Sequence, residues 1–173
     1  LALAASDFSG NLITEKVRVP YEYENTPESL ERLGEIINDF IATLPLAKEE
    51  ILQVCVNLAE RVNPFEGRAY NMFTFLKESL TDKLTELIQL PVCIENDSRS
   101  MAFAEYCKGC CKGVKDVIFV NVCWGLGIGI IINGQLFYGK SGYSGEFGHM
   151  TAYNNNIICH CGKIGCIETE VSG

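Results

Sequence analysis

Residues 145–149 read GEFGH, and residues 159–168 read CHCGKIGCIE. Together they place one imidazole and three thiols at spacings that suit a closed tetrahedral zinc site. Unpaired thiols, or a redox pair of Cys159 with Cys161, are the alternative interpretations. Of these interpretations, the sequence favours a zinc-binding loop. The four candidate metal ligands are His149, Cys159, Cys161 and Cys166.

Two further features of this loop bear on its geometry. Gly162 and Gly165 allow the backbone to turn tightly enough for the flanking thiolates to face one ion. His160 is a rival fourth ligand, because it also carries an imidazole. It lies between two of the cysteines, so we expect its side chain to point away from the ion.

A second candidate site consists of Asn96 and Asp97, which follow a short predicted strand and open a predicted helix. A carboxylate at the end of a parallel strand lies where α/β proteins bind ligands. Asp97 could therefore accept a proton from a substrate hydroxyl as a general base. A plain helix cap is the alternative interpretation of the pair.

Glu146 and Glu168 bracket the metal loop and form a third candidate site. Two carboxylates in this position could accept hydrogen bonds from vicinal sugar hydroxyls. Acids that only support the metal ligands, or that lie at the surface, are the alternative.

The fourth candidate is a glycine-rich turn between two predicted strands, formed by Gly125, Gly127 and Gly129. Glycines let backbone N–H groups approach a phosphate. The turn lacks the Gly-Lys-Ser/Thr ending of a Walker loop. Close packing of a tight hairpin explains the glycines about as well.

Along the rest of the chain, helical and strand patterns alternate, which predicts the α/β class. The predicted helices cover residues 27–44, residues 75–88 and a segment that begins at residue 96. Asn133 and Gly134 predict a hairpin turn. The predicted strands cover residues 1–5, 12–19, 51–58, 91–94, 117–122, 128–132 and 135–138.

Composition excludes several classes of protein. The 173 residues are 47% hydrophobic and 21% charged, which argues against a disordered chain. A net charge of −8 disfavours nucleic-acid binding by this segment alone. No apolar run is long enough for a membrane span. Nine cysteines without a secretory signal favour reduced thiols and a cytoplasmic location, and the missing initiator Met suggests a piece of a longer protein.

In this order and spacing, these residues resemble the ROK family of repressors, uncharacterised reading frames and sugar kinases. The resemblance covers nearly the whole chain. It implies an actin-like ATPase fold of the ribonuclease H type, present in part, with a zinc-binding loop. Residues 1–95 would form most of the N-terminal α/β lobe. Residues 96–173 would begin the C-terminal lobe, with the sugar bound between the lobes.

The resemblance also implies roles for individual residues. In kinase members, the position of Asp97 is the base that activates the sugar hydroxyl, with ATP and Mg²⁺ as cofactors. His149 would both bind zinc and touch the sugar, so the metal would shape the pocket without acting as a Lewis acid. The implied sugar contacts are Asn96, Asp97, Glu146, His149 and Glu168.

The chain departs from the kinase pattern at the phosphate turn. Kinase members carry Gly-Thr-Gly there, whereas this chain has Leu126 in place of the threonine. Trp124 stands where a small residue is usual, and residues 58–64 replace the family's Gly-x-Pro-Gly loop. The family's first phosphate loop and its adenine-side loops would lie outside this chain.

These departures predict the sugar-sensing effector domain of a transcriptional regulator of carbohydrate metabolism. Its ligand would be a monosaccharide or a sugar phosphate, and DNA would bind only through a helix-turn-helix domain that precedes Leu1. A homodimer or higher oligomer is a family expectation, and no membrane partner is expected. An ATP-dependent sugar kinase is the alternative, and a protein-binding module with a vestigial site is a third possibility.

Overall fold

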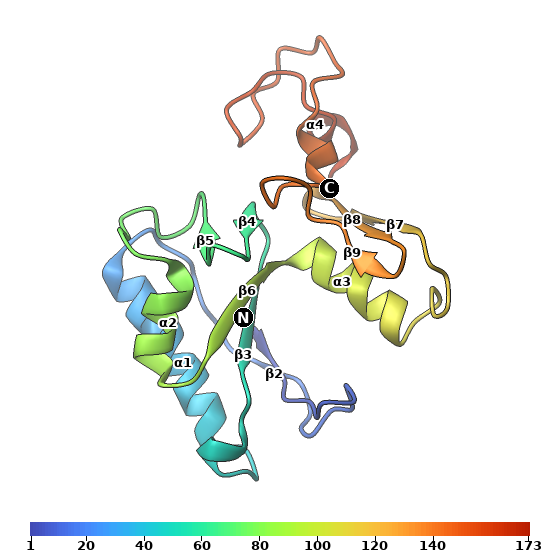
Figure 1. Cartoon of the computed structure of the whole chain (residues 1–173). Helices are drawn as coiled ribbons and strands as arrows, with labels where there is room; N and C mark the ends of the chain where they lie inside the picture. Colours follow the sequence, from blue (N-terminus) through green and yellow to red (C-terminus); the bar gives the residue numbers. More distant parts are fainter. The chain divides into compact units, whose positions relative to one another are not determined.

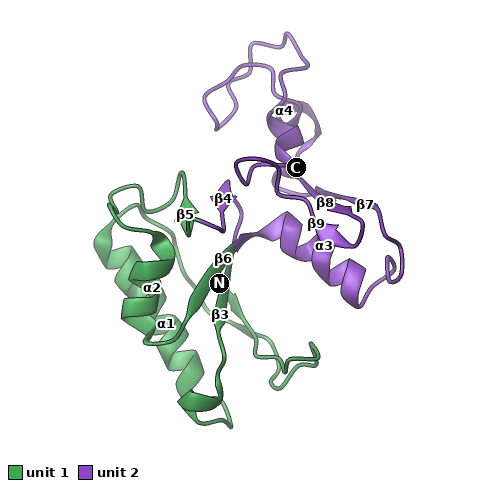
Figure 2. Ribbon diagram, in the orientation of Figure 1, with its two compact units in different colours: residues 1–56, 66–94 green, residues 57–65, 95–173 purple.

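The computed structural model describes all residues, 1–173, and divides into two compact units, shown in Figures 1 and 2. Unit 1 contains residues 1–56 and 66–94, and unit 2 contains residues 57–65 and 95–173. Helices and strands alternate along the chain, so the predicted α/β class is confirmed. That these units correspond to the two lobes implied by the resemblance stays a prediction. None of the helices combines the length and apolar character that a membrane crossing requires.

Unit 1 packs two helices against each other. Thr26 caps the first, because its hydroxyl accepts a hydrogen bond from the Ser29 N–H at 3.2 Å. The second helix begins five residues later than predicted, because the Ser79 hydroxyl caps it through the Asp82 N–H at 3.0 Å. The helices are α1 (Pro27–Ala42) and α2 (Leu80–Ile88). The core between and beside them includes Leu30, Leu33, Ile37, Leu84 and Ile88.

The strands of unit 1 are short. The predicted N-terminal strand pair is present, and its strands run antiparallel. A second two-stranded sheet pairs Val54–Leu58, within the predicted segment 51–58, with the strand that ends at the Asn96 cap, and both strands extend from unit 1 into unit 2. These pairs are β1 (Ala2–Leu3) with β2 (Val17–Arg18), and β3 (Val54–Leu58) with β6 (Val92–Asn96). The remaining short elements of unit 1 are η1 (Lys48–Glu50) and β5 (Arg68–Ala69), whereas β4 (Val62–Asn63) belongs to unit 2.

Unit 2 is built on an antiparallel three-stranded sheet, with one helix packed on it. The predicted hairpin turn is confirmed, with φ values of 52° at Asn133 and 78° at Gly134. In strand order, the sheet contains β7 (Val117–Val122), β8 (Leu126–Ile132) and β9 (Gln135–Leu136). The helices are α3 (Asp97–Cys107), η2 (Glu146–His149) and α4 (Glu168–Val171).

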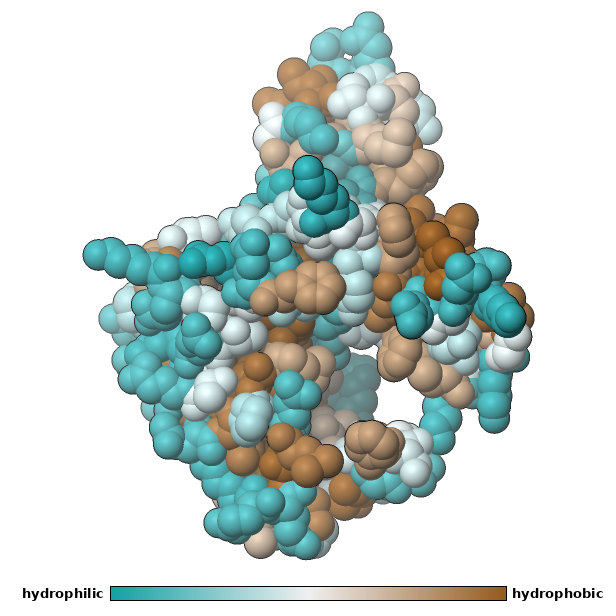
Figure 3. All heavy atoms as spheres, in the orientation of Figure 1, coloured by the Kyte–Doolittle hydropathy of each residue, from teal (hydrophilic) through white to brown (hydrophobic).

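One face of this sheet is apolar and solvent-exposed. Asn121 donates to the Ser98 hydroxyl of α3 at 3.1 Å, so its face of β7 is the one that α3 covers. Side chains alternate along a strand, and Ile118, Val120 and Val122 therefore lie on the opposite face, where they are exposed. Hydrophobic residues gather over β7 and β8 in Figure 3.

Two of the glycines predicted to form a phosphate turn lie within a strand. β8 begins at Leu126, two residues before the predicted strand. A Cβ added at Gly127 would overlap the Ser98 hydroxyl, and one at Gly129 would overlap the Cβ of Ala102. These contacts support close packing as the reason for both glycines, because they let α3 approach the sheet. Their role in phosphate binding stays a prediction.

The packing of α3 on β8 predicts the effect of a single methyl group. We expect Gly129→Ala to lower the free energy of unfolding by about 1–3 kcal/mol, because the added carbon overpacks this contact. Urea denaturation measures this loss. In the background of Ala102→Gly, which removes the opposing Cβ, Gly129→Ala should cost less. Equal costs in both backgrounds would contradict the contact.

Candidate functional site

Four candidate ligand atoms come together in unit 2, all within 4.8 Å of one another. Cys159 Sγ lies 3.5 Å from His149 Nδ1, and Cys161 Sγ lies 3.6 Å from Cys166 Sγ. Tetrahedral zinc, with bonds of about 2.3 Å to sulfur and about 2.0–2.1 Å to nitrogen, separates its ligand atoms by about 3.5–3.8 Å. The donor set and these two distances therefore fit one tetrahedral ion.

Backbone hydrogen bonds close the loop around these ligands. The Cys159 N–H donates to the Lys163 carbonyl, and the Gly162 N–H donates to the Cys159 carbonyl, both at 2.8 Å. Gly162 and Gly165 have φ values of +86° and +75°, as the predicted tight turns require. The loop therefore holds its cysteines in place through its own backbone.

Burial sets the protonation of the thiols. It raises the pKa of Cys159 to about 12 and also raises the pKa of Cys166. Burial acts in the same direction on Cys161, but hydrogen bonds from the Lys163 N–H and the other two thiols outweigh it and lower its pKa. Cys159 and Cys166 thus favour the neutral thiol unless a cation compensates the thiolate charge.

Glu168 connects the cysteine loop to the glycine turn. Its carboxylate is buried, and Oε2 accepts the Leu126 N–H at 2.9 Å. Oε1 lies 3.0 Å from His160 Nδ1 and 3.9 Å from His149 Nδ1. His160 is outside the group of three cysteines and His149, but its Nδ1 lies only 3.9 Å from Cys159 Sγ, so its side chain does not point away from the candidate ligands. Its ring also contacts Glu168, because the buried carboxylate attracts an imidazole N–H, and His149, His160 and Glu168 form a second group of close ligand atoms.

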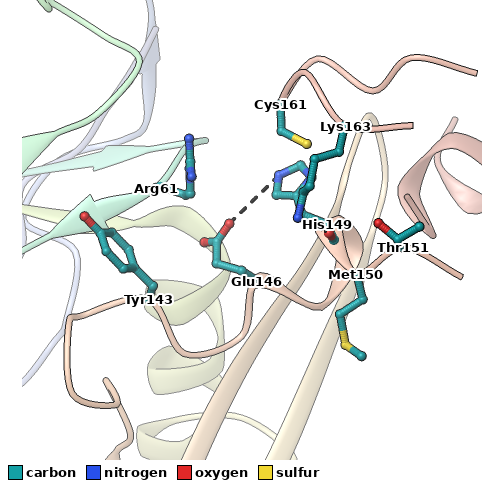
Figure 4. A pocket seen from close by; sticks show the side chains of 8 residues that line it. All are labelled: Arg61, Tyr143, Glu146, His149, Met150, Thr151, Cys161 and Lys163. Carbon is teal, nitrogen blue, oxygen red and sulfur yellow. Dashed lines mark hydrogen bonds and ion pairs between the residues drawn. The ribbon is translucent and has the colours of Figure 1, made fainter. Parts of the chain in front are cut away.

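A pocket of about 670 Å³ lies beside the cysteine loop, entirely within unit 2 (Figure 4). Glu146 Oε2 lies 3.9 Å from His149 Nε2, as the dashed line in Figure 4 marks. His149 therefore faces the cysteines through one ring nitrogen and the pocket through the other. The lining residues are Arg61, Tyr143, Glu146, His149, Met150, Thr151, Cys161 and Lys163.

Burial shifts the pKa of Glu146 and of His149, two pocket residues that the sequence indicated. It raises the pKa of Glu146, although Arg61 and Arg99 act in the opposite direction. It lowers the pKa of His149, against the attraction of Glu168. The neutral imidazole that results is the form that coordinates a metal ion.

Asn96 and Asp97 lie at the start of α3 and do not line this pocket. Asn96 is the helix cap, since its side-chain oxygen accepts the Arg99 N–H at 3.0 Å. Asp97 Oδ1 accepts the Ser98 N–H at 2.6 Å, whereas Oδ2 accepts no hydrogen bond. Asp97 thus keeps one carboxylate oxygen available to a ligand.

Several pocket residues were not predicted from the sequence. Lys163 lies between Cys161 and Cys166, and Thr151 lies two residues after His149. Their polar side chains could therefore have indicated them as pocket residues. Arg61 comes from a segment more than eighty residues earlier in the chain, and no spacing rule connects it to the cysteine loop. The residues in this group are Arg61, Tyr143, Met150, Thr151 and Lys163.

Comparison with known proteins places the chain among sugar-related repressors and kinases. It is 30% identical over 169 residues to the xylose repressor of Bacillus subtilis (strain 168), which covers 96% of this chain and 44% of the repressor. It is 31% identical over 176 residues to an N-acetylmannosamine kinase of Salmonella agona (strain SL483), which covers 99% of this chain and 58% of the kinase. The chain therefore spans about half the length of these curated relatives.

The fold agrees with the sequence comparison. A ROK family glucokinase from Streptomyces griseus, solved in complex with glucose and AMPPNP, matches 99% of this chain and 53% of its own. The TM-score is 0.75 at 30% sequence identity. The family model for ROK proteins matches residues 2–173, and the chain belongs to the ROK family.

Proposed function

We propose that the chain is the sugar-sensing effector domain of a ROK-type transcriptional regulator of carbohydrate metabolism. The observation that carries this proposal is the hydrogen bond from the Leu126 N–H to Glu168 Oε2, at 2.9 Å. The family resemblance assigns this turn to phosphate binding in kinases. Here the N–H of Leu126, at the position of the kinase threonine, already donates its hydrogen bond to the buried carboxylate of Glu168. Its negative charge opposes the approach of a phosphate.

The metal loop would serve this function as a structural element. We propose that His149, Cys159, Cys161 and Cys166 hold one Zn²⁺, because their donor set and spacing fit a closed tetrahedral site. Zinc would supply charge compensation and rigidity. His149 would then present its second ring nitrogen to the pocket in a fixed orientation.

Sugar recognition would combine carboxylates with the imidazole. The carboxylate of Glu146 would accept hydrogen bonds from sugar hydroxyl groups, and a carboxylate can accept two at once. Arg61 and Lys163 also line the pocket and bring cationic donors, which suit a sugar or a sugar phosphate. Asn96, Asp97 and Glu168 do not line this pocket, and they remain proposed sugar contacts on the family resemblance alone.

The second candidate is an ATP-dependent sugar kinase, and one observation favours it. Asp97 Oδ2 accepts no hydrogen bond, as a general base that awaits a substrate hydroxyl requires. In that case Asp97 would accept the hydroxyl proton during phosphoryl transfer, and the reaction would need ATP and Mg²⁺. The N-acetylmannosamine kinase among the relatives makes this alternative concrete.

DNA binding under the regulator proposal would require a separate basic domain. The chain carries a net charge of −8, which opposes contact with phosphate groups. We therefore propose that a helix-turn-helix domain outside this chain binds DNA. A homodimer would pair two such domains on one operator.

A thermal-shift experiment tests sugar binding by the complete gene product. We expect at least one of D-xylose, N-acetyl-D-mannosamine and D-glucose to raise the melting temperature. Glu146→Gln should weaken that binding about 10- to 100-fold, because it removes a hydrogen bond to a charged group. Glu22→Gln, the same change at an exposed residue of unit 1, should have no effect. The proposal is wrong if none of the sugars stabilises the protein, and Glu146 is wrongly assigned if its variant binds like wild type.

A further inference from the structure

Arg99 is a buried cation in the first turn of α3, with 3% of its side chain exposed. All of its hydrogen-bonding nitrogens have partners. Nε donates to Glu95 Oε1 at 2.7 Å, one terminal nitrogen donates to the Gly142 carbonyl at 2.5 Å, and the other donates to the Val62 carbonyl at 2.8 Å. The guanidinium therefore joins three segments of unit 2 that are far apart in the sequence.

Glu95 and Tyr138 complete this network. The Tyr138 hydroxyl donates to Glu95 Oε2 at 3.0 Å, so the two carboxylate oxygens are shared between Tyr138 and Arg99. The guanidinium carbon lies 5.1 Å from the centre of the Tyr138 ring, within the range of a cation–π contact. The buried positive charge is thus paired, hydrogen-bonded and stacked, which fixes its position.

The segment that this network holds leads directly to the pocket. Residues 139–145 have no helix or strand of their own, and they connect Tyr138 to Glu146. Tyr138 anchors the beginning of this segment, and the Arg99 contact with the Gly142 carbonyl anchors its middle. Tyr143 within this segment and Glu146 directly after it both line the pocket.

We propose that Arg99 is a positioning residue of the sugar pocket, which acts by holding residues 139–145 so that Glu146 points at the ligand. This inference rests on the proposed function, because it assigns Glu146 to sugar recognition. Arg99 itself does not line the pocket. It acts through the backbone of the segment and has no contact with the sugar.

Arginine chemistry explains why this position needs its particular side chain. A guanidinium offers five N–H donors in one rigid plane, so it can donate to Glu95, Gly142 and Val62 at once while it stacks on Tyr138. A lysine keeps the charge but presents a single ammonium at the end of a flexible stem. Arg99→Lys therefore preserves the charge and releases most of the contacts.

The test compares Arg99→Lys with wild type in the complete gene product, with D-xylose, N-acetyl-D-mannosamine and D-glucose as the probes. We expect the dissociation constant of the sugar that binds wild type to rise about tenfold or more, because small displacements of a binding group are costly. Backbone amides of residues 139–148 should exchange with deuterium faster. The metal content per chain should stay at the wild-type value.

A double-mutant cycle separates positioning from a general loss of stability. In the Glu146→Gln background, Arg99→Lys should weaken sugar binding much less than it does in wild type, because the group that it positions is already changed. The proposal is overturned if Arg99→Lys raises the dissociation constant by the same factor in the Glu146→Gln background as in wild type. Ile94→Val, a buried change in unit 1, is the control, and an equal loss of affinity in this variant would also overturn it.

A second variant and the binding behaviour of wild type cover the two cases in which Arg99→Lys alone gives no answer. Should Arg99→Lys fail to fold, Tyr138→Phe removes the hydroxyl that donates to Glu95 and keeps the ring beside Arg99, and we expect smaller effects in the same direction. Unchanged exchange and affinity in that variant would count against the proposal. Failure of wild type to bind any of the three sugars contradicts the proposed function instead. Amide exchange in residues 139–148 then decides whether Arg99 holds the segment.

Discussion

Replacing Cys161 by serine is expected to release the metal and loosen the segment from Gly148 to Glu168. Wild type should contain one zinc ion per chain, and Cys161→Ser should contain close to none, because a serine hydroxyl is a poor ligand for zinc. Without the ion, the buried thiols lose the cation that holds them together. A loss of several kcal/mol should lower the melting temperature by about 10 °C or more. Elemental analysis and calorimetry measure both effects.

Cys107→Ser is the matched control for this prediction. Cys107 is exposed at the end of α3 and does not belong to the group of four ligands. We expect this variant to keep its zinc and its melting temperature. The zinc assignment is wrong if Cys161→Ser retains one zinc ion per chain and melts at the wild-type temperature.

Asp97→Asn is expected to abolish the response to sugar without unfolding the protein. Asparagine has the same shape and keeps an oxygen that can accept the Ser98 N–H, so the start of α3 should remain intact. The substitution removes the negative charge and turns one carboxylate oxygen into a donor. Titration calorimetry should show no sugar binding, while the melting temperature without sugar changes by less than about 2 °C.

The first turn of α2 provides a comparison for this variant. Asp82→Asn makes the same change in the first turn of a helix in unit 1, and we expect it to keep the full sugar response. A preserved response in Asp97→Asn would remove Asp97 from the ligand site. Unfolding of Asp97→Asn would mean that its carboxylate stabilises the helix start.

The sequence predicted local features well. The clustering of the four candidate ligands was predictable from their spacing, because they lie within eighteen residues and backbone turns at two glycines bring them together. The hairpin at Asn133 and Gly134 followed from turn chemistry. The predicted start of the second helix at residue 75 was wrong, since the Ser79 cap places it at Leu80.

Tertiary contacts account for what the sequence did not reveal. Whether Gly127 and Gly129 form a turn or pack against a helix depends on where α3 lies, and no local pattern records that. Arg61 lines the pocket from a distant segment, and Arg99 hydrogen-bonds to two backbone carbonyls. A backbone carbonyl is present at every position, so the sequence cannot mark it as a partner.

ATP consumption by the complete gene product, with Mg²⁺ and the same three sugars, tests the central claim most directly. We predict that a sugar which stabilises the protein causes no ATP consumption above the sugar-free rate, because the Leu126 amide is engaged by Glu168. Sugar-dependent ATP consumption that disappears in Asp97→Asn would contradict the sensor and establish a sugar kinase.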